Sequence, residues 1–282
     1  MEVEGAVVLI TGASSGIGHA AAVAFDAAGA RVAIAARRRE RLEQLAKQMR
    51  DALAVPTDLC NDDEAAAMVE QTEAHFGRLD VLINNAGAAF VSRSDCVDPA
   101  ALRHILDSNL VGQVVATGRA VTCMRQTGGG HVINVGSPAG WMGSPLLATY
   151  AATKAAVSGW TRSLQAEWAN TEITVSEYFP GLIETELGAA AGAAPELAAD
   201  SANLLDNPPR RWIAELLSKP LAPEVAGAQL VELVHRPRAV AYSSFSIRLL
   251  MWLAQYPRLR GLMGLEMRNA FRKRLGSSIF SD

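Results

Sequence analysis

A tyrosine and a lysine lie four residues apart in the stretch TYAATKAAVSGW, with small residues around them. On a helix, positions i and i+4 share one face, so Tyr150 and Lys154 can contact the same ligand. A free phenol has a pKa near ~10, and lowering it by about three units requires roughly 4 kcal/mol of preference for the phenolate. An ammonium about 4 Å away supplies only ~1 kcal/mol in water but ~4 kcal/mol in a partly enclosed site. The pair therefore predicts proton transfer in a site shielded from water.

A serine strengthens this prediction, because a tyrosine four residues before a lysine is by itself as consistent with chance as with chemistry. Ser137 closes the segment GHVINVGS, which reads as a buried strand. The ends of such strands form the edge at which open α/β sheets bind ligands. A hydroxyl there can hydrogen-bond a carbonyl oxygen while Tyr150 exchanges the proton. The alternative for Ser137 is an ordinary turn serine at the end of a strand.

Six short segments rich in Val and Ile read as buried strands, because each is bounded by Gly, Asp or Asn. Longer helical segments lie between them. This alternation predicts an α/β fold with a doubly wound parallel sheet of the Rossmann type and helices on both faces. The six segments are Ala6–Ile10, Arg31–Ala36, Ala52–Asp58, Leu79–Gly87, Gly130–Ser137 and Ile173–Gly181.

The first strand leads directly into a glycine-rich segment, TGASSGIG, which contains Gly12, Gly16 and Gly18. Without side chains, the backbone can approach a pyrophosphate, which binds to free N–H groups at the start of the next helix. Glycine spacing alone is a weak signal, and an ordinary glycine turn is the alternative. The position between a strand and an alanine-rich helix nevertheless favours a dinucleotide site.

The end of the second strand indicates which dinucleotide is bound. An NAD site usually has a carboxylate there for the ribose hydroxyl, but here Ala36 is followed by three arginines, Arg37, Arg38 and Arg39. A guanidinium can bind a 2′-phosphate through two hydrogen bonds. We assign the phosphate to Arg37, which lies nearest the strand, and place Arg38 and Arg39 on the solvated face of the next helix. The alternative is that all three face solvent. The sequence thus favours NADP(H) over NAD(H).

Composition excludes several other classes of protein. The formal net charge is −3, so a chain that is basic throughout, as expected for binding nucleic acid, is excluded. The three cysteines are scattered, which indicates neither a disulfide framework nor a zinc site. The N-terminus is acidic where a signal peptide is basic, and no run reaches the ~18 apolar residues of a spanning helix. We expect a cytoplasmic protein without a metal.

Six motifs together resemble those of the short-chain dehydrogenases/reductases, in the order in which that family has them. The resemblance covers about Ala6–Thr185 and points to the compact, single-domain branch. It implies an oxidoreductase that forms a homodimer or homotetramer, paired through the helices that hold Asn109 and Tyr150. The motifs are TGASSGIG, NNAG (Asn84–Gly87), SNLVG (Ser108–Gly112), GSPAG, YAATK and PGLIET (Pro180–Thr185).

The resemblance also implies a role for each matching residue. Tyr150 is the general acid/base, and Lys154 lowers its pKa and holds the nicotinamide ribose. Ser137 orients the reacting oxygen, and Asn109 completes a proton relay through a water near Lys154. Asp58 and Leu59 touch the adenine, although Asp58 could instead cap the next helix. Ile183 and Thr185 hold the carboxamide of the nicotinamide. The full set of implied coenzyme contacts is Gly12, Ser14, Gly16, Ile17, Gly18, Arg37, Asp58, Leu59, Asn85, Gly87, Tyr150, Lys154, Pro180, Gly181, Ile183 and Thr185.

The last part of the chain departs from the strand–helix alternation. We expect one domain over residues 1–242, with a substrate lid at 188–223, and a basic extension over residues 243–282. From Arg236 onward the chain has nine basic and two acidic residues, and Ile247–Leu275 has apolar residues at helical spacing between arginines. Such a basic amphipathic helix either packs over the substrate mouth or a partner subunit, or lies on an anionic membrane. The apolar lid and extension indicate an apolar substrate.

The leading hypothesis is therefore an NADP(H)-dependent oxidoreductase that interconverts a secondary alcohol and a ketone, or an aldehyde, on a largely apolar small molecule. Two alternatives are a non-catalytic dinucleotide-sensing protein and a membrane-associated binding protein of the same fold. A sensor needs the glycine turn but no acid–base pair. The presence of Asn109, Ser137, Tyr150 and Lys154 together therefore argues against it.

Overall fold

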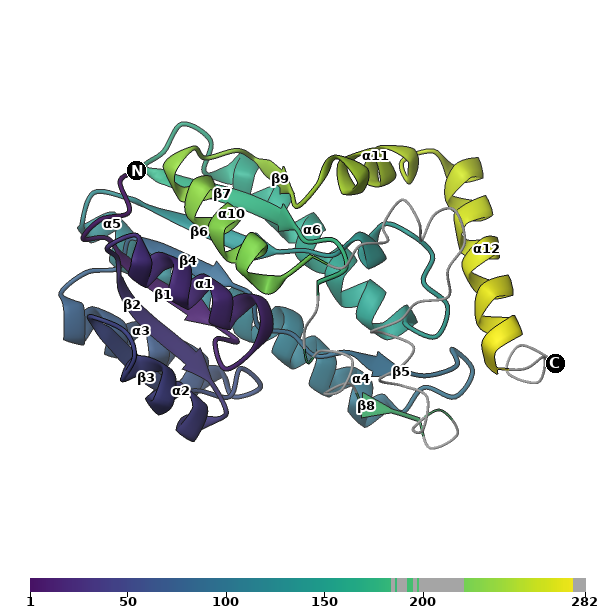
Figure 1. Cartoon of the computed structure of the whole chain (residues 1–282), viewed down its shortest axis with the longest axis horizontal. Coiled ribbons are helices and arrows are strands. Elements are labelled where there is room, and N and C mark those ends of the chain that lie inside the picture. The colour runs from purple at the N-terminus through teal and green to yellow at the C-terminus, as the bar shows by residue number, and fades with distance from the viewer. Residues whose placement is uncertain (184–185, 187–191, 195–196, 198–220, 276–282) are drawn as a thin grey trace.

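A computed structural model describes residues 1–183, 186, 192–194, 197 and 221–275 of the 282-residue chain. In this part of the chain, seven parallel strands form the main sheet, in the order β3-β2-β1-β4-β6-β7-β9 (Figure 1). This arrangement confirms the predicted α/β fold with a doubly wound sheet. A seventh strand, β9, was not among the six predicted ones. The strands are β1 (Val7–Thr11), β2 (Arg31–Ala36), β3 (Ala52–Pro56), β4 (Val81–Asn84), β6 (Gly130–Val135), β7 (Ile173–Phe179) and β9 (Val240–Tyr242).

Helices cover both faces of the sheet, because alternate residues of each buried strand point to opposite sides. In β1, Val8 and Ile10 pack on one side, and Val7 and Leu9 pack on the other. The first side is covered by α1 (Gly16–Ala27), α2 (Arg39–Ala46) and α10 (Pro223–His235). The second is covered by α3 (Asp62–Phe76), α5 (Gly112–Gln126) and α6 (Ala148–Glu167), while α4 (Pro99–Leu106) precedes α5.

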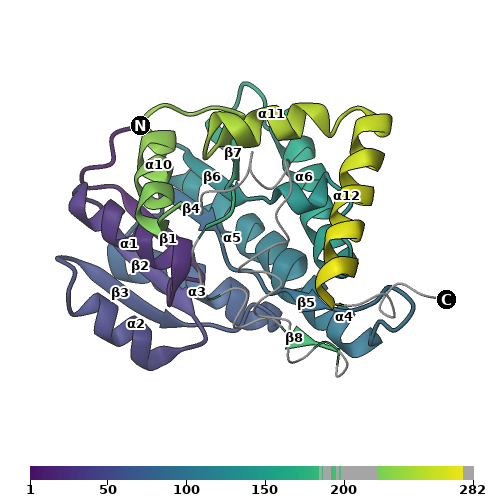
Figure 2. The same ribbon diagram turned by 45° about the vertical axis from the view of Figure 1, so that its right-hand side comes forward.

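The C-terminal extension contains two helices where the sequence predicts one. Helix α11 (Phe245–Leu253) ends before Pro257, which is the first residue of α12 (Pro257–Leu275). Proline has no N–H to continue a helix but fits its first turn, so the chain bends there. Both helices lie beside the carboxyl end of the sheet (Figure 2). Within the described residues, no helix has the length and apolar character needed to cross a membrane.

The inner faces of these two helices pack against the loop that follows β6. Leu250 and Met263 form one apolar cluster with Met142, and Trp141 packs against it. Phe271, near the end of α12, packs with Leu146 in another cluster. The inner face of this segment is therefore packed on the rest of the chain.

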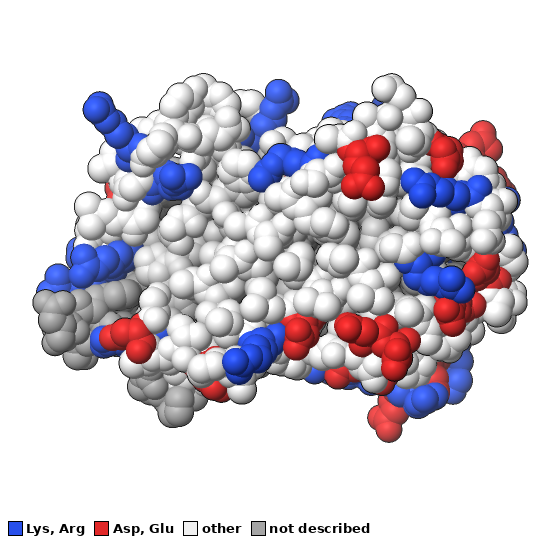
Figure 3. Space-filling view, turned by 180° about the vertical axis from the view of Figure 1, so that it is seen from behind, with Lys and Arg blue, Asp and Glu red and all other residues white. Residues whose placement is uncertain are grey.

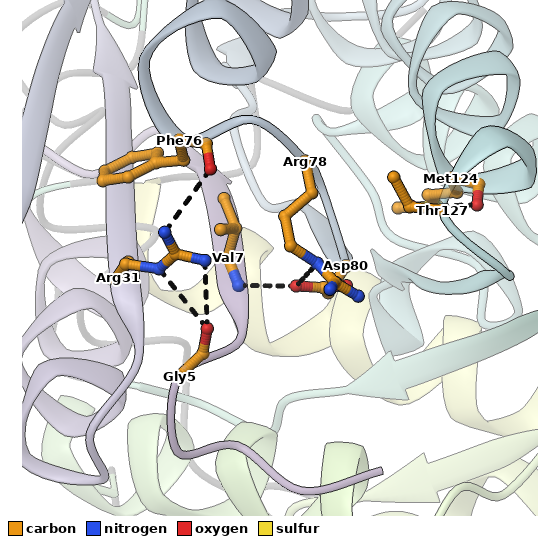
Figure 4. A network of polar contacts seen from close by, with 8 residues as sticks. All are labelled: Gly5, Val7, Arg31, Phe76, Arg78, Asp80, Met124 and Thr127. Atoms are coloured by element: carbon orange, nitrogen blue, oxygen red, sulfur yellow. Dashed lines mark hydrogen bonds and ion pairs between the residues drawn. The ribbon is translucent and has the colours of Figure 1, made fainter.

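A buried carboxylate holds the opposite, amino-terminal edge of the sheet together (Figure 4). Asp80 immediately precedes β4 and is 4% exposed. It accepts a hydrogen bond from the Val7 backbone N–H at 2.8 Å and is paired with Arg78 at 2.6 Å. Nearby, the Arg31 side chain donates to the backbone oxygens of Gly5 and Phe76. These contacts fix where β1 and β4 begin, and so set the register in which their far ends reach the ligand edge.

We expect Asp80→Ala to lower the free energy of unfolding by about 2–4 kcal/mol, because it leaves a buried N–H without an acceptor and Arg78 without its anion. Urea unfolding followed by circular dichroism measures the change. Glu232→Ala is the control, since it removes an exposed partner of Arg236 and should cost less than about 0.5 kcal/mol. Equal losses for the two variants would contradict this role of Asp80.

Candidate active site

The loops that follow four neighbouring strands meet at the carboxyl edge of the sheet. Gly12 follows β1, Asn85 follows β4, Ser137 lies two residues after β6, and Pro180 follows β7. This is the edge at which ligands bind in open α/β sheets. The structure therefore brings to one place residues that are far apart in the sequence.

The glycine turn has the shape that a phosphate site requires. Gly12 and Gly16 have positive φ angles of 70° and 57°, which other residues rarely adopt. A Cβ on Gly18 would lie 2.5 Å from the Gly12 carbonyl oxygen, so a side chain does not fit there. Ser15, the residue before α1, makes no side-chain hydrogen bond to the first turn of the helix. The backbone N–H groups at the start of α1 are thus available to an anion, and the turn fits a dinucleotide pyrophosphate.

Asn85 joins this turn to the loop after β4. Its side-chain amide donates to the Thr11 backbone oxygen at 2.8 Å, and its backbone N–H donates to the Thr11 hydroxyl at 3.0 Å. Its amide nitrogen would also lie 2.6 Å from a Cβ on Gly18, so the two loops are in close contact. Asn85 therefore positions the glycine turn, while direct contact with a coenzyme stays a prediction.

Arg38 is exposed, as expected, and its side chain also lies against the glycine turn. Its guanidinium donates to the hydroxyls of Ser14 at 3.0 Å and Ser15 at 2.6 Å. It also forms an ion pair with Glu186, which Arg41 shares. Arg37 is exposed, and its assignment to a phosphate stays a prediction. A cation at this turn fits the additional phosphate of NADP(H).

On the adenine side, Asp58 does not cap the next helix, since Asn61 accepts the hydrogen bonds from the first turn of α3. Asp58 instead accepts from the Cys60 backbone N–H at 3.0 Å, which closes a tight turn. Leu59 is buried, and its backbone oxygen lies so close to Gly112 that no side chain fits at the glycine. The contacts of Asp58 and Leu59 with adenine are not tested by these observations.

Asn109 is fully buried within a π-helical turn, Asp107–Val111, between α4 and α5. Such turns are rare and occur frequently at functional sites. Its side chain donates to the Ala88 oxygen at 2.8 Å and to Thr153 at 3.1 Å, and it accepts from the Ala88 N–H at 2.7 Å. Asn109 thus links the loop after β4 to α6, the helix of Tyr150.

The Lys154 ammonium is enclosed at the same point. Its exposed fraction is 3%, and its Nζ donates to the Val135 backbone oxygen at 2.8 Å. A Cβ on Gly87 would lie 3.6 Å from this nitrogen and 3.5 Å from Asn109 Oδ1, so the three residues converge. Burial lowers the pKa of Lys154 to about 8, and the negative charge of Glu177 opposes that change.

Tyr150 and Ser137 face each other at this site. Burial raises the pKa of Tyr150, and a hydrogen bond with Ser137 opposes the increase. The Ser137 oxygen also accepts from the Ala139 backbone N–H at 3.2 Å. Lys154 Nζ lies 6.0 Å from the centre of the Tyr150 ring. In the coenzyme-free chain the pKa of Tyr150 is thus raised, and its lowering by Lys154 in a site closed by a bound dinucleotide stays a prediction.

Sequence reasoning did not identify the polar residues that support the site. Thr153 receives the hydrogen bond of Asn109 and donates to the Tyr150 backbone oxygen at 2.8 Å. Asn84 is the buried last residue of β4 and bonds to Asn134 on β6 at 2.9 Å. The sequence signal that could have identified the asparagine pair was a polar residue inside an otherwise apolar strand, as in β4 and β6.

The loop after β7 brings in the C-terminal segment. The Gly181 backbone N–H donates to the Ser243 hydroxyl at 2.8 Å, and a Cβ on Gly181 would lie 3.1 Å from Ile247 of α11. Ile183 forms an isolated bridge with Leu221. Thr185 and most of the proposed lid at 188–223 lie outside the described residues. Gly192–Ala193 form the short strand β8, which pairs with β5 (Phe90–Val91).

The residues that the structure describes contain no cluster of three or more His, Cys, Asp or Glu side chains that could hold a metal ion. The arrangement instead combines a hydroxyl, a phenol, a buried ammonium and a phosphate-binding turn. Such a set can move a proton beside a bound dinucleotide.

Comparison with known sequences identifies similar proteins. A family model described as short chain dehydrogenase matches residues 6–196. The 11-beta-hydroxysteroid dehydrogenase 1A of Arabidopsis thaliana is 36% identical over 189 residues, covering 65% of this chain and 54% of the relative. The match thus spans about half the length of that relative.

Solved structures are similar over more of the chain. A short-chain dehydrogenase from Streptomyces avermitilis has a TM-score of 0.77 and 27% identity, covering 97% of this chain and 100% of that one. A 3-ketoacyl-(acyl-carrier-protein) reductase from Brucella melitensis, complexed with NADH, has a TM-score of 0.72 and 28% identity, covering 85% and 97% of the respective chains.

Proposed function

This chain belongs to the short-chain dehydrogenase family, and we propose that it is an NADP(H)-dependent oxidoreductase that interconverts a secondary alcohol and a ketone, or an aldehyde, on a largely apolar small molecule. The observation that carries the proposal is the convergence of Asn109, Ser137, Tyr150 and Lys154 beside a glycine turn that fits a pyrophosphate. The relatives' names support an alcohol or ketone as the reacting group, since they include a hydroxysteroid dehydrogenase and a ketoacyl reductase.

Each residue of this group has a separate task. The bound coenzyme supplies a nicotinamide ring that accepts or gives a hydride. Ser137 donates a hydrogen bond to the substrate oxygen and so holds it next to the Tyr150 hydroxyl. In the oxidative direction the phenolate of Tyr150 takes the alcohol proton, and in the reductive direction the phenol returns it. Lys154 stabilises the phenolate, which requires that the site be closed to water.

We expect Tyr150→Phe to reduce turnover by at least about a thousandfold, because the variant has no group to exchange the proton. NADPH binding, measured by quenching of protein fluorescence, should change by less than about threefold, since the ring is retained. The control is Tyr256→Phe, which alters an exposed tyrosine between α11 and α12. Normal turnover by Tyr150→Phe would favour the alternative of a dinucleotide-sensing protein.

The preference for NADP(H) rests on cations at the glycine turn. Arg38 donates hydrogen bonds to Ser14 and Ser15 in this turn. The last residue of β2 is Ala36, so the position that usually has a carboxylate for the ribose hydroxyl of NAD has none. Arg37 lies next to it and is the second candidate for the 2′-phosphate. The Brucella relative is complexed with NADH, so family membership alone does not decide the preference.

We expect Arg38→Ala to raise the dissociation constant of NADPH by about ten- to a hundredfold, the loss of one charge-assisted contact, and to leave that of NADH unchanged. Isothermal titration calorimetry measures both. Arg39→Ala is the control, because Arg39 forms only an exposed pair with Glu43. Equal effects on NADPH and NADH would contradict a phosphate contact, and a larger effect from Arg37→Ala would assign the phosphate to Arg37.

An apolar substrate is supported by the side chains near the site. Trp141 and Met142 follow the short helical turn Pro138–Gly140 that begins after Ser137, and they pack with Leu250 and Met263 of the C-terminal helices. The extension over residues 243–282 is therefore a cover for the substrate mouth of the domain over residues 1–242. We retain residues 188–223 as a proposed substrate lid.

A homodimer or homotetramer is supported by the face opposite α1 and α10. Seen from behind in Figure 3, this face is largely uncharged over its middle, and charged side chains lie around its edges. Helices α5 and α6 cover the sheet on that side, and Val111 and Val114 are exposed there. An uncharged surface with exposed apolar side chains such as these valines is a candidate contact between subunits.

We propose that the outer face of α11 and α12 makes peripheral contact with an anionic membrane. Phe245, Trp252 and Leu262 are 76%, 52% and 57% exposed, and Arg258 and Arg260 are also exposed on α12. Exposed apolar side chains beside cations are typical of helices that bind at a lipid surface. On this reading the protein is cytoplasmic and binds the membrane reversibly.

We expect the protein to sediment with vesicles of phosphatidylserine and phosphatidylcholine, and less with phosphatidylcholine alone. The double variant Phe245→Ser/Trp252→Ser should reduce this binding at least about tenfold, because it removes the largest exposed apolar groups. The control is Val225→Ser, an exposed position on α10. If the protein binds neither kind of vesicle, membrane contact is contradicted. Covering the substrate mouth would then be the one proposed role of α11 and α12.

A further inference from the structure

The active-site face of α6 continues beyond Lys154. Four residues on this helix follow one another at intervals of four, namely Tyr150, Lys154, Ser158 and Arg162. Residues at that interval lie on one face. The neighbouring strand β7 places Glu177 against this face, with an exposed fraction of 2%. The catalytic pair is thus the first half of a longer polar row that meets a buried carboxylate.

The carboxylate is held tightly in place. Ser158 Oγ donates a short hydrogen bond to Glu177 Oε1, and Trp141 Nε1 donates to the Ser158 oxygen at 3.4 Å. A Cβ on Gly136 would lie 2.8 Å from Glu177 Oε1, so the carboxylate lies against the residue that precedes Ser137. A buried carboxylate costs free energy unless charged or polar partners compensate.

We propose that Glu177 is a positioning residue that acts through Lys154. The carboxylate of Glu177 keeps the Lys154 side chain in the ammonium form within the closed site. This inference rests on the proposed function, because the ammonium is needed only if Tyr150 must become a phenolate. Lys154 has one hydrogen bond to a neutral group, the Val135 carbonyl. Glu177 supplies the negative charge that the carbonyl lacks.

The charges around Glu177 are consistent with this role. Burial raises the pKa of its carboxyl, and the hydrogen bond from Ser158 and the charges of Arg162 and Lys154 on α6 oppose that increase. Burial also raises the pKa of Tyr242 on β9; Arg248 of α11 opposes this increase, and the charge of Glu177 adds to it. The Arg162 guanidinium is held 5.0 Å above the Trp141 ring. Two cations therefore share one buried carboxylate.

The direction of the effect follows from the two titrations. Burial raises the pKa of Glu177 to about 7 and lowers that of Lys154 to about 8. The two opposite charges each favour the charged form of the other group, so an ionised Glu177 opposes loss of the proton from Lys154 as pH rises. Without the Glu177 carboxylate, Lys154 loses its proton at a lower pH, and we expect turnover to be lost at a lower pH as well.

The test is the titration of Lys154 itself in the coenzyme-free protein. The chain has four lysines, so ¹³Cε-labelled lysine gives few NMR signals, and Lys154→Arg identifies the one to follow. We expect the isosteric variant Glu177→Gln to lower the pKa of Lys154 by about one unit or more. Glu172→Gln, which removes an exposed partner of Arg125, is the control and should change nothing. An unchanged Lys154 titration in Glu177→Gln would overturn the proposal.

A second variant and a kinetic measurement complete the test. Ser158→Ala retains the carboxylate but removes its hydrogen-bond donor, so it should lower the pKa of Lys154 less than Glu177→Gln does. In turnover, the alkaline limit of kcat should move to lower pH in Glu177→Gln, with KM for the coenzyme changed less than about threefold. A shift of the Lys154 titration without movement of this limit would overturn the link to the reaction. Because the NMR titration needs no turnover, failure of the proposed function would leave the coupling of Glu177 and Lys154 measurable.

Discussion

The site depends on one buried ammonium. Lys154 is removed from water, which costs several kcal/mol unless partners replace the lost hydration. The Val135 carbonyl is one partner, and Glu177 contributes a compensating charge. The loop that contains Gly87 lies close to the ammonium, since a Cβ on Gly87 would be 3.6 Å from Lys154 Nζ. The fold brings the Val135 carbonyl, Glu177 and the Gly87 loop together near the carboxyl edge of the sheet. These groups together offset the free energy of burying the ammonium.

Closing the site is the second requirement, because a charge affects a neighbouring phenol strongly only where the effective dielectric constant is low. Helices α11 and α12 contribute to that closure by packing on Trp141 and Met142, next to Ser137. Burial alone raises the pKa of Tyr150. A closed site therefore lowers the pKa of Tyr150 only if a positive charge, that of Lys154, is enclosed together with the phenol. In this account the C-terminal extension affects the chemistry of Tyr150, about 100 residues earlier in the sequence.

The sheet could be predicted from the sequence because its strands are short apolar runs bounded by glycine and polar residues. Spacing and resemblance predicted that Asn109, Ser137, Tyr150 and Lys154 lie together, while their catalytic roles stay a prediction. Which arginine lies at the glycine turn could not be predicted, because the direction of the Arg38 side chain depends on the turn between β2 and α2. Glu177 was missed because pairing of β7 with its neighbours decides which way its side chain points. Pro257, in contrast, was a readable signal for the helix break.

The most direct test of this account measures the phenolate of Tyr150. Ultraviolet difference spectroscopy follows the ionisation of tyrosine, and subtracting the Tyr150→Phe spectrum isolates one of the four tyrosines. With saturating oxidised coenzyme, the account predicts that Tyr150 ionises at least about two pH units below the ordinary value near ~10, whereas in the free protein it ionises above that value. A phenol that ionises at the same high pH with and without coenzyme would contradict it.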